Sequence, residues 1–465
     1  MKYFNTKRTI LAGALCLSLI GFASCQDDTV DMNGLENAER IPMKTVTNQA
    51  TLDVISQLKK DAPDAIIAHR GSTFWTPEET EAAFRWARNM GADYLEVDIQ
   101  RSSDGVLLAL HDNNLRRTSN IESVYPARVD ADISNFTLKE LRALDAGTWF
   151  NEDKTDNARQ EFVNQKISTL EDVLMIAEGN RVKRELKGGN YDADGKPFYQ
   201  EIDGDGNVIG ETTDLSKSNG HFIYEVDALD NGNRPGVYPE TKEPWRFSGM
   251  EADLAKFLKK HGWLSTDATT LKNIPTQAGK VGVANTKSRI ILQTFSWQSM
   301  QLLEKNLPNV PKCMLLWKGG YDNLAGDTPE MIADVMDFCV DNNVHIVGPS
   351  IGGAPNKYDD ITAPWMCKMY HRPGFLIHAY SFDTQDQLKK YNGDYYYEKT
   401  ASRFDDANRV LANEWKGNIT RDMFIDAGFT NLTDLSLKYQ GRAQTGVTAE
   451  SVLVDFGYET KVGRK

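Results

Sequence analysis

Short apolar runs recur along the chain and alternate with longer segments of helical periodicity. Such runs, when flanked by polar turn residues, predict buried strands. They lie at residues 65–68, 94–99, 106–110, 236–240, 289–293, 314–317, 344–347 and 375–378. Helical patterns lie between them, at residues 81–89, 170–177, 250–261 and 299–305. The repeated strand-then-helix order predicts an α/β fold with a parallel sheet, and the number of units favours a closed TIM (β/α)8 barrel.

The barrel is expected to span residues 51–455, with extra sequence in two places. Residues 113–166 form a small insertion after the second strand. Residues 188–235 are rich in Gly, Asp and Asn and predict an inserted loop with a β-hairpin. An open, doubly wound sheet is the alternative arrangement, but the sequence has no GxGxxG phosphate loop to support it.

The first residues have the pattern of an export signal. Lys2, Lys7 and Arg8 precede an apolar run at residues 10–23, which is too short to span a bilayer as a helix. The run ends in Ala23-Ser24-Cys25, which resembles a bacterial lipobox with Cys25 as the lipidated first mature residue. We therefore expect residues 1–24 to be a lipoprotein signal peptide. A plain secretory signal is the alternative.

Residues 25–50 are polar, lack periodicity and predict a tether. Their acidic start, Gln26-Asp27-Asp28, resembles the surface-export tag of lipoproteins of the Bacteroides group. The sequence thus predicts an exported outer-membrane lipoprotein on the periplasmic or cell-surface side, with a lipid anchor in the membrane.

Charge and cysteine content narrow the possible partners. Loss of the three positive charges in residues 1–24 lowers the formal net charge from −13 to −16, which disfavours nucleic acid as a partner. The remaining cysteines are Cys25, Cys313, Cys339 and Cys367. Their wide spacing indicates neither a disulfide framework nor a zinc site.

Polar clusters stand at the ends of the first strands. His69-Arg70-Gly71 follows the strand at 65–68, and His111-Asp112 follows the apolar run at 106–110. Residues at the carboxyl ends of barrel strands face the active-site mouth. An arginine there suits bidentate phosphate binding, and two histidines suit proton transfer near neutral pH.

Glu96 and Asp98 lie two residues apart in the strand at 94–99, so both side chains face the same side of the sheet. Two carboxylates held side by side repel each other unless a proton or a cation lies between them. Oxygen ligands of this kind suit Ca²⁺ or Mg²⁺ better than zinc. We therefore expect one divalent cation at this position.

Together these motifs resemble the amino-terminal signature of the glycerophosphodiester phosphodiesterase family. The signature consists of His69-Arg70-Gly71, Pro77-Glu78-x-Thr80, residues 91–98 (GADYLEVD), Ser103-Asp104-Gly105 and His111-Asp112. Residues 238–245 (YPETKEPW) resemble a later strand of the same family. Glu79, Asn431 and Thr433 depart from the residues usual in the family; these departures concern the local loop geometry and not the cation ligands or the histidines.

The resemblance implies a role for each matched residue. His69 and His111 would be the catalytic histidines, and Arg70 and Lys242 would bind phosphate. The cation ligands would be Glu96, Asp98 and Glu240. Glu185-Leu186-Lys187 repeats the Glu-x-Lys pattern, so Glu185 is the alternative third ligand.

The activity implied is metal-dependent hydrolysis of a small glycerophosphodiester to glycerol 3-phosphate and an alcohol. The nucleophile is water or the glycerol 2-hydroxyl through a cyclic phosphate. A related barrel phosphodiesterase acting on lysophospholipid or phosphoinositide head groups is the alternative enzyme. The non-enzymatic alternative is a surface lipoprotein that binds lipid or glycan, which the presence of both histidines disfavours.

Overall fold

The computed structural model describes residues 38–318, 328–397, 409–411 and 420–462. The predicted signal peptide and Cys25 lie outside the described residues. Among the helices that the structure describes, none is both long and apolar enough to cross a bilayer.

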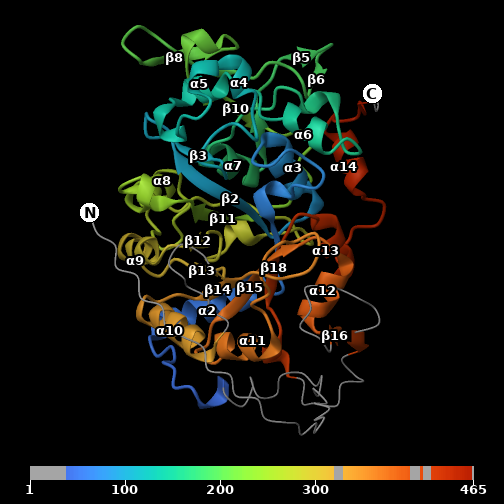
Figure 1. Ribbon diagram of the computed structural model, residues 1–465. Helices are drawn as coiled ribbons and strands as arrows, with labels where there is room; N and C mark the ends of the chain where they lie inside the picture. The colour runs from blue at the N-terminus through green and yellow to red at the C-terminus, as the bar shows by residue number, and fades with distance from the viewer. Residues whose placement is uncertain (1–37, 319–327, 398–408, 412–419, 463–465) are drawn as a thin grey trace, which may run out of the picture.

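Eight parallel strands close into a barrel, because the first strand pairs with both the second and the last. In order around the barrel they are β1 (Ile66–Ala68), β2 (Tyr94–Arg101), β11 (Gly236–Thr241), β12 (Leu292–Thr294), β13 (Lys312–Leu316), β14 (Ile346–Pro349), β15 (Leu376–Phe382) and β18 (Ala427–Thr430). The protein is therefore a TIM barrel, as its sequence pattern predicts (Figure 1).

Alternate residues of each strand face the barrel interior and the surrounding helices. In β2, Tyr94 packs in the interior cluster, whereas Leu95 and Val97 pack in the layer beneath the helices. Because the side-chain period of a strand is two, Glu96 and Asp98 share the interior face of Tyr94. The interior positions are apolar near the amino ends of the strands and become charged on β2 toward the carboxyl end.

Helices surround the barrel on its outside. They are α3 (Glu81–Met90), α7 (Leu170–Ala177), α8 (Met250–Lys260), α9 (Trp297–Asn306), α10 (Pro329–Asp341), α11 (Pro364–His371), α12 (Gln385–Asn392), α13 (Thr433–Tyr439) and α14 (Ala449–Asp455). Several begin at threonines that cap free backbone N–H groups; Thr169 and Asp172, for example, form a capping box at α7.

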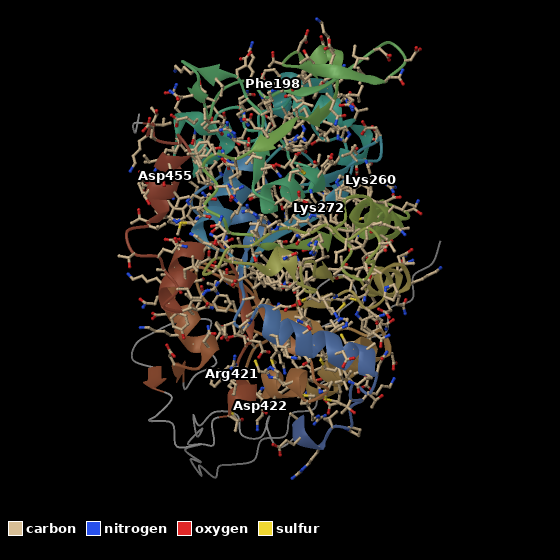
Figure 2. The ribbon with its side chains drawn as sticks, turned by 180° about the vertical axis from the view of Figure 1, so that it is seen from behind. Phe198, Lys260, Lys272, Arg421, Asp422 and Asp455 are labelled. Carbon is tan, nitrogen blue, oxygen red and sulfur yellow. The ribbon has the colours of Figure 1, made fainter. Side chains whose placement is uncertain are left out.

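Helix α2 (Gln49–Asp61) closes the amino end of the barrel, where it crosses the face seen from behind in Figure 2. Ile55 and Leu58 of α2 are buried in the same cluster as the interior side chains of the strands. The amino end is thus plugged by apolar side chains, which leaves the carboxyl ends of the strands as the open end.

One predicted strand does not follow the alternation of parallel strands and helices. The run at 106–110 contributes β3 (Leu107–Ala109), which pairs antiparallel with β2 at the edge of the sheet and is not a strand of the barrel. The short turn through Ser103-Asp104-Gly105, with Gly105 at φ +86°, permits only a hairpin return. β3 therefore runs back along β2, and its end lies beside Asp98, whose carbonyl accepts the N–H of Leu110 at 2.8 Å.

The two stretches of extra sequence lie together above the barrel in Figure 1. Residues 113–166 form short helices, α4 (Ile121–Val124), α5 (Leu138–Arg142) and α6 (Thr148–Asp153). The second stretch forms more than one hairpin, and its strands also pair with residues that precede it. Within it, β7 (Tyr199–Ile202) pairs with both β8 (Val208–Thr212) and β9 (Ser218–Phe222). β10 (Tyr224–Val226) pairs with the preceding β4 (Asn180–Val182), and β6 (Asn190–Tyr191) with the preceding β5 (Leu186–Lys187).

Buried ion pairs attach the second stretch to the barrel helices. Asp227, which follows β10, accepts hydrogen bonds from Arg85 and Arg88 of α3 at 2.7–2.9 Å, with all three side chains fully buried. Arg184 likewise pairs with Glu81 at the start of α3 at 2.6 Å. Removing one partner would leave an uncompensated buried charge, so these pairs hold the added strands in one position.

Residues 38–48 fall in the stretch assigned to a tether, and they lie against the barrel. Val46 donates its N–H to the carbonyl of Pro373 at 2.9 Å, and Arg372 donates to the carbonyl of Ala38 at 2.8 Å. Ala38 is buried in the cluster formed by α10, α11 and the strands beneath them. These contacts fix the chain before α2 begins at Gln49.

Candidate active site

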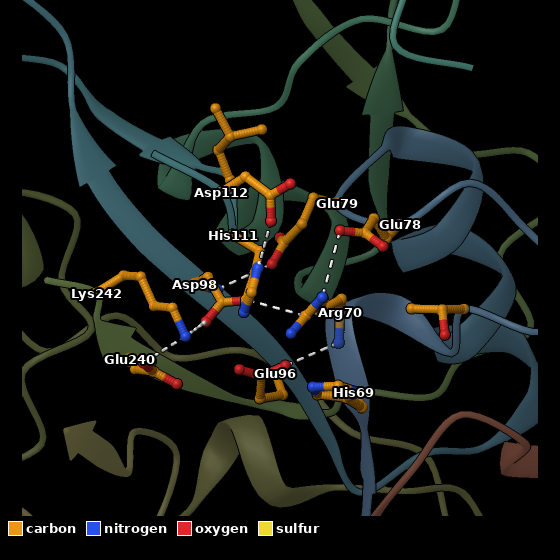
Figure 3. A network of polar contacts seen from close by, with 12 residues as sticks. His69, Arg70, Glu78, Glu79, Glu96, Asp98, His111, Asp112, Glu240 and Lys242 are labelled. Carbon is orange, nitrogen blue, oxygen red and sulfur yellow. Dashed lines mark hydrogen bonds and ion pairs between the residues drawn. The ribbon is translucent and has the colours of Figure 1, made fainter. Parts of the chain in front are cut away.

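A cavity of about 530 Å³ opens at the carboxyl ends of the strands. Its lining includes His69, Arg70, Glu96, His111, Glu240 and Lys242, which are six of the seven barrel residues singled out from the sequence. The seventh, Asp98, is buried directly beneath them and pairs with both Arg70 and Lys242. Figure 3 shows these side chains converging from β1, β2, β3 and β11.

Strand register brings the three proposed cation ligands together. β11 pairs with β2 so that Glu240 lies opposite Asp98, and Glu96 is two positions earlier on the same interior face. One carboxylate oxygen from each residue lies within 4.8 Å of the others, and all three side chains are buried. Glu185 lies outside this set; it is exposed, at the start of the added strands.

The chemistry of this cluster fits a divalent cation. Burial and neighbouring carboxylates raise the pKa of Glu96 well above its ordinary value, and burial raises that of Glu240 to about 7. Asp98 Oδ2 accepts no hydrogen bond from any described residue, although Arg70 Nε lies 3.0 Å away in a poorly aligned position. Three buried carboxylates, with an unsatisfied oxygen on Asp98, provide the hard oxygen ligands that Ca²⁺ or Mg²⁺ prefers.

Two cations compensate part of this negative charge. Lys242 Nζ lies 3.2 Å from Glu240 and 3.8 Å from Asp98, which raises the pKa of Lys242 against the opposing effect of its burial. Arg70 donates its backbone N–H to Glu96 at 2.8 Å and places its guanidinium between Asp98 and Glu78. Both residues line the cavity, so both are available to an anionic ligand.

The turn that carries Arg70 depends on a glycine. Arg70, Gly71 and Ser72 all have positive φ, and a Cβ on Gly71 would lie 2.6 Å from the Cβ of Ala83 in α3. Only glycine combines the left-handed backbone with this close approach to the helix. The turn places His69 and Arg70 at the top of β1, facing the carboxylates of β2.

Each histidine has its Nδ1 occupied by a different kind of acceptor. His111 Nδ1 lies 2.7 Å from a carboxylate oxygen of Asp112. His69 Nδ1 lies 2.7 Å from Oδ1 of Asn431, whose Nδ2 donates to Asp383 at 2.8 Å and so fixes the orientation of the amide. Both rings are therefore held as Nδ1–H donors, which leaves Nε2 of each for proton transfer.

Burial and the nearby Arg70 guanidinium lower the pKa of both imidazoles. The pKa of His69 falls to about 3, and that of His111 also falls, although Asp98 and Asp112 oppose the change there. Both groups are then neutral near pH 7 in the absence of a ligand. Bound phosphate would bring negative charge toward both rings and favour their protonated forms.

The sequence analysis assigned no role to two residues of the site, Arg117 and Gln293. Arg117 donates to both oxygens of Glu78, at 2.5 and 3.0 Å, and to Asp112 at 2.6 Å, and thereby connects the acceptor of His111 with the partner of Arg70. Gln293 of β12 donates to Glu96 at 3.0 Å. No spacing pattern marks either residue, because each reaches the site through tertiary structure alone.

The opposite side of the cavity is lined mainly by aromatic side chains, which we call the aromatic half; its members are Phe295, Leu315, Trp317, Tyr358, Tyr380 and Phe429. The rings of Phe295, Tyr358 and Phe429 each lie edge-to-face or tilted against Tyr380, with centroids 5.6–6.5 Å apart. We call the opposing residues from β1, β2, β3 and β11 the charged half.

The fold and this site define a barrel protein with three clustered, buried carboxylates beside two imidazoles and two cationic side chains that line the cavity. Residues 69–220 match the model of the glycerophosphoryl diester phosphodiesterase family. This range begins at the first site histidine and contains both histidines and two of the three clustered carboxylates. The first part of the barrel, over residues 69–220, is thus similar to this family of phosphodiesterases.

Two curated relatives and one solved structure are also similar to the chain. The glycerophosphodiester phosphodiesterase of Bacillus subtilis is 25% identical over 331 residues, which cover 71% of this chain and 80% of the relative. The glycerophosphoinositol inositolphosphodiesterase of Mus musculus is 39% identical over 120 residues, 24% of this chain and only 22% of the mouse protein. A solved structure of a glycerophosphoryl diester phosphodiesterase from Agrobacterium tumefaciens is 13% identical and superposes with a TM-score of 0.47, covering 82% of this chain and 98% of that one.

Proposed function

We propose that the protein hydrolyses a glycerophosphodiester to glycerol 3-phosphate and an alcohol, with a divalent cation at Glu96, Asp98 and Glu240. The observation that carries this proposal is the convergence of two Nδ1-bound imidazoles on one cluster of buried carboxylates. A phosphodiester is anionic and resists attack, so its hydrolysis requires charge neutralisation together with proton transfer at two oxygens.

Different side chains would carry out the charge neutralisation and the proton transfer. Arg70 and Lys242 would bind the non-bridging oxygens of the phosphate and neutralise the charge that grows on them. His69 and His111 would exchange protons with the substrate: one imidazole takes the proton of the attacking hydroxyl, and the other gives a proton to the departing alkoxide oxygen. The cation, when bound, would supply Lewis-acid stabilisation of a phosphoryl oxygen.

The aromatic half would accommodate the remainder of the substrate. Its rings offer apolar faces next to the charged half, which suits a ligand with a phosphate at one end and carbon-rich groups at the other. Trp317 and Tyr358 are 39% and 37% exposed, so they stand at the mouth, where a projecting group of the substrate would pass.

The proposal is tested by assaying glycerophosphocholine, glycerophosphoethanolamine, glycerophosphoinositol and lysophospholipids, each with Ca²⁺ and with Mg²⁺. We expect metal-dependent release of glycerol 3-phosphate from one or more of the glycerophosphodiesters. No turnover of any substrate with either ion would contradict the proposal. Turnover that is unaffected by chelation would contradict the role of the divalent cation.

A head-group phosphodiesterase is the second candidate, favoured by the match to the mouse glycerophosphoinositol enzyme over 120 residues. The two candidates differ in the bond that is broken. Glycerophosphoinositol would give glycerol 3-phosphate and inositol in the first case, but inositol phosphate and glycerol in the second. Identification of the phosphorylated product by phosphorus NMR decides between them.

We also propose that Cys25 is lipidated and that the protein is tethered to the outer membrane outside the cytoplasm. The support is the apolar run at residues 10–23 that ends in Ala23-Ser24-Cys25. Cys25→Ala should release the protein from the membrane fraction. Unchanged fractionation of this variant would contradict the anchor.

A further inference from the structure

A fourth carboxylate lies against the three that cluster. Glu79 is 3% exposed and reaches the site from the turn before α3. Its Oε1 accepts the backbone N–H of Asp98 at 2.9 Å, the contact joined by a dashed line in Figure 3. Its Oε2 is buried and accepts no hydrogen bond from any described residue.

The neighbours of Glu79 do not neutralise it. The adjacent Glu78 is paired through both oxygens with Arg117, at 2.5 and 3.0 Å. Among the described residues Glu79 has no ion-pair partner, and the charged groups around it include the carboxylates of Asp98 and Glu96 as well as Arg70. Four carboxylates, Glu79, Glu96, Asp98 and Glu240, therefore face the two cations Arg70 and Lys242, an excess of two negative charges when all six are ionised.

The backbone at Glu79 is also held in an unfavourable conformation. Its φ is +59°, a region where a long side chain carries a steric cost and where Asn or Gly fits better. Its N–H donates to the carbonyl of Arg70 at 3.1 Å, so the strained residue is fixed against the turn that carries His69 and Arg70. Strain of this kind persists where the surrounding structure requires it, and it concentrates at functional sites.

We propose that Glu79 is a positioning residue of the cation site, which holds Asp98 through its backbone and supplies the negative charge that balances a divalent ion. The inference rests on the proposed function, because it presupposes a cation at Glu96, Asp98 and Glu240. Glu79 acts from outside that set of three: its role is to orient a ligand and to add charge behind it. Groups in this position commonly change metal affinity by about 10–100-fold.

The alternative is a purely structural role, in which the side chain only satisfies the N–H of Asp98. Glu79→Gln separates the two, because the amide oxygen of glutamine can still accept that hydrogen bond while the charge is lost. We expect Ca²⁺ and Mg²⁺ to bind the Glu79→Gln protein about 10–100-fold more weakly in isothermal titration calorimetry without substrate. We also expect the metal-free variant to melt at the same or a higher temperature, since glutamine keeps the hydrogen bond to Asp98 and no ion-pair partner of Glu79 is lost.

Glu78→Gln is the matched control, because it removes a charge from the next residue but from a carboxylate that is paired with Arg117 and Arg70. Its cation affinity should stay within about threefold of wild type, well below the change that a neighbouring ligand-orienting group causes. An equal loss in both variants would overturn the specific role of Glu79, and unchanged affinity in Glu79→Gln would overturn it directly. Should Glu79→Gln fail to fold, Glu79→Asn, which tolerates positive φ, gives the same test of charge.

The failure of the proposed function has a different signature. A wild-type protein that binds neither ion would overturn both the metal site and the role of Glu79. A wild-type protein that binds metal as expected, with Glu79→Gln indistinguishable from it, would overturn only the role of Glu79.

Discussion

The charged half and the aromatic half of the cavity are built on the same barrel by the same alternation of side chains, yet they differ in burial and in mutual dependence. In the charged half, Glu96, Asp98 and Glu240 are 1–6% exposed, and each contacts a cation or a backbone N–H that would lose its partner if the carboxylate were removed. In the aromatic half, the rings touch mainly each other, and Trp317 and Tyr358 are more than a third exposed.

Because of this difference, substitutions in the two halves should have effects of different size. Charges buried at low dielectric are strongly coupled, so loss of one partner leaves another uncompensated, and function is lost steeply. Apolar contacts at a half-open mouth contribute by area and tolerate changes of shape. We therefore expect substitutions in the charged half to act on catalysis by orders of magnitude, and those in the aromatic half to act on substrate binding by modest factors.

The largest effect is expected from Glu240→Gln, which keeps the size of the side chain but removes one of three clustered carboxylates. Loss of Lewis-acid stabilisation worth several kcal/mol corresponds to a fall of about 10³-fold in kcat/KM. Excess Ca²⁺ or Mg²⁺ should restore part of the activity. The measurement is kcat/KM at increasing metal concentration.

Glu185→Gln is the control for that experiment, because Glu185 lies in the same Glu-x-Lys pattern but is exposed and outside the cluster. It should alter kcat/KM by less than about twofold, as is usual for an exposed position. If Glu185→Gln loses the metal while Glu240→Gln keeps it, the assignments of Glu240 and of Lys242 are both reversed.

An effect of comparable size is expected from the two histidines. His69→Ala and His111→Ala each remove a proton-transfer group, which should lower kcat by about 10²–10⁴-fold. Thermal melting of both variants should remain cooperative, since both rings line the cavity and neither belongs to an apolar core cluster. Near-wild-type turnover by either variant would remove that histidine from the mechanism.

A smaller effect is expected in the aromatic half. Trp317→Ala removes a ring at the mouth, and loss of about 1 kcal/mol of apolar contact should raise KM about fivefold with kcat unchanged. Trp245→Ala, at an exposed tryptophan that does not line the cavity, is the matched control and should leave KM unaltered. A fall in kcat of Trp317→Ala equal to the rise in KM would contradict the division of labour between the halves.

The charged half could be predicted from the sequence because its residues come in local pairs. The two-residue period of a strand places Glu96 with Asp98, and Glu240 with Lys242, on one face each. The two-residue period does not show which of these pairs lie next to each other in the fold. Asp98 and Glu240 are opposite each other only through the register of β2 and β11, which are separated in the sequence by the added strands, so Glu185 remained the alternative third ligand.

The aromatic half could not be predicted, because its members are single residues that lie on or follow separate strands. Phe295, Trp317 and Tyr358 come from three different strand ends and share no spacing, so only the closed barrel brings them together. The direction of β3 could not be predicted for a related reason: an apolar run predicts a strand but not whether the strand runs parallel or antiparallel to its neighbour. Glu79 was noticed only as a departure from a motif, and its contact with Asp98 required the folded turn.

The smallest effect tests whether the two histidines differ because of their Nδ1 partners. His69 faces the amide of Asn431, and burial with the nearby Arg70 lowers its pKa to about 3; His111 faces a carboxylate. Since the folded-state pKa of His69 lies below its ordinary value of 6.5, its protonation costs stability as the pH falls from 6.5 toward 3. Asn431→Asp would put a carboxylate at Nδ1 and should raise this pKa, so that less stability is lost on acidification and the limb of the rate profile that His69 sets moves to higher pH. Because Asn431 also donates to Asp383, the change is best made together with Asp383→Asn, which keeps an amide facing a carboxylate there.

NMR titration of the His69 ring measures the shift directly, and the reciprocal change Asp112→Asn should lower the pKa of His111. An unchanged His69 titration in the exchanged pair would show that burial and Arg70 set its pKa regardless of the acceptor at Nδ1, and the contrast between the two histidines would then lie elsewhere than in their partners.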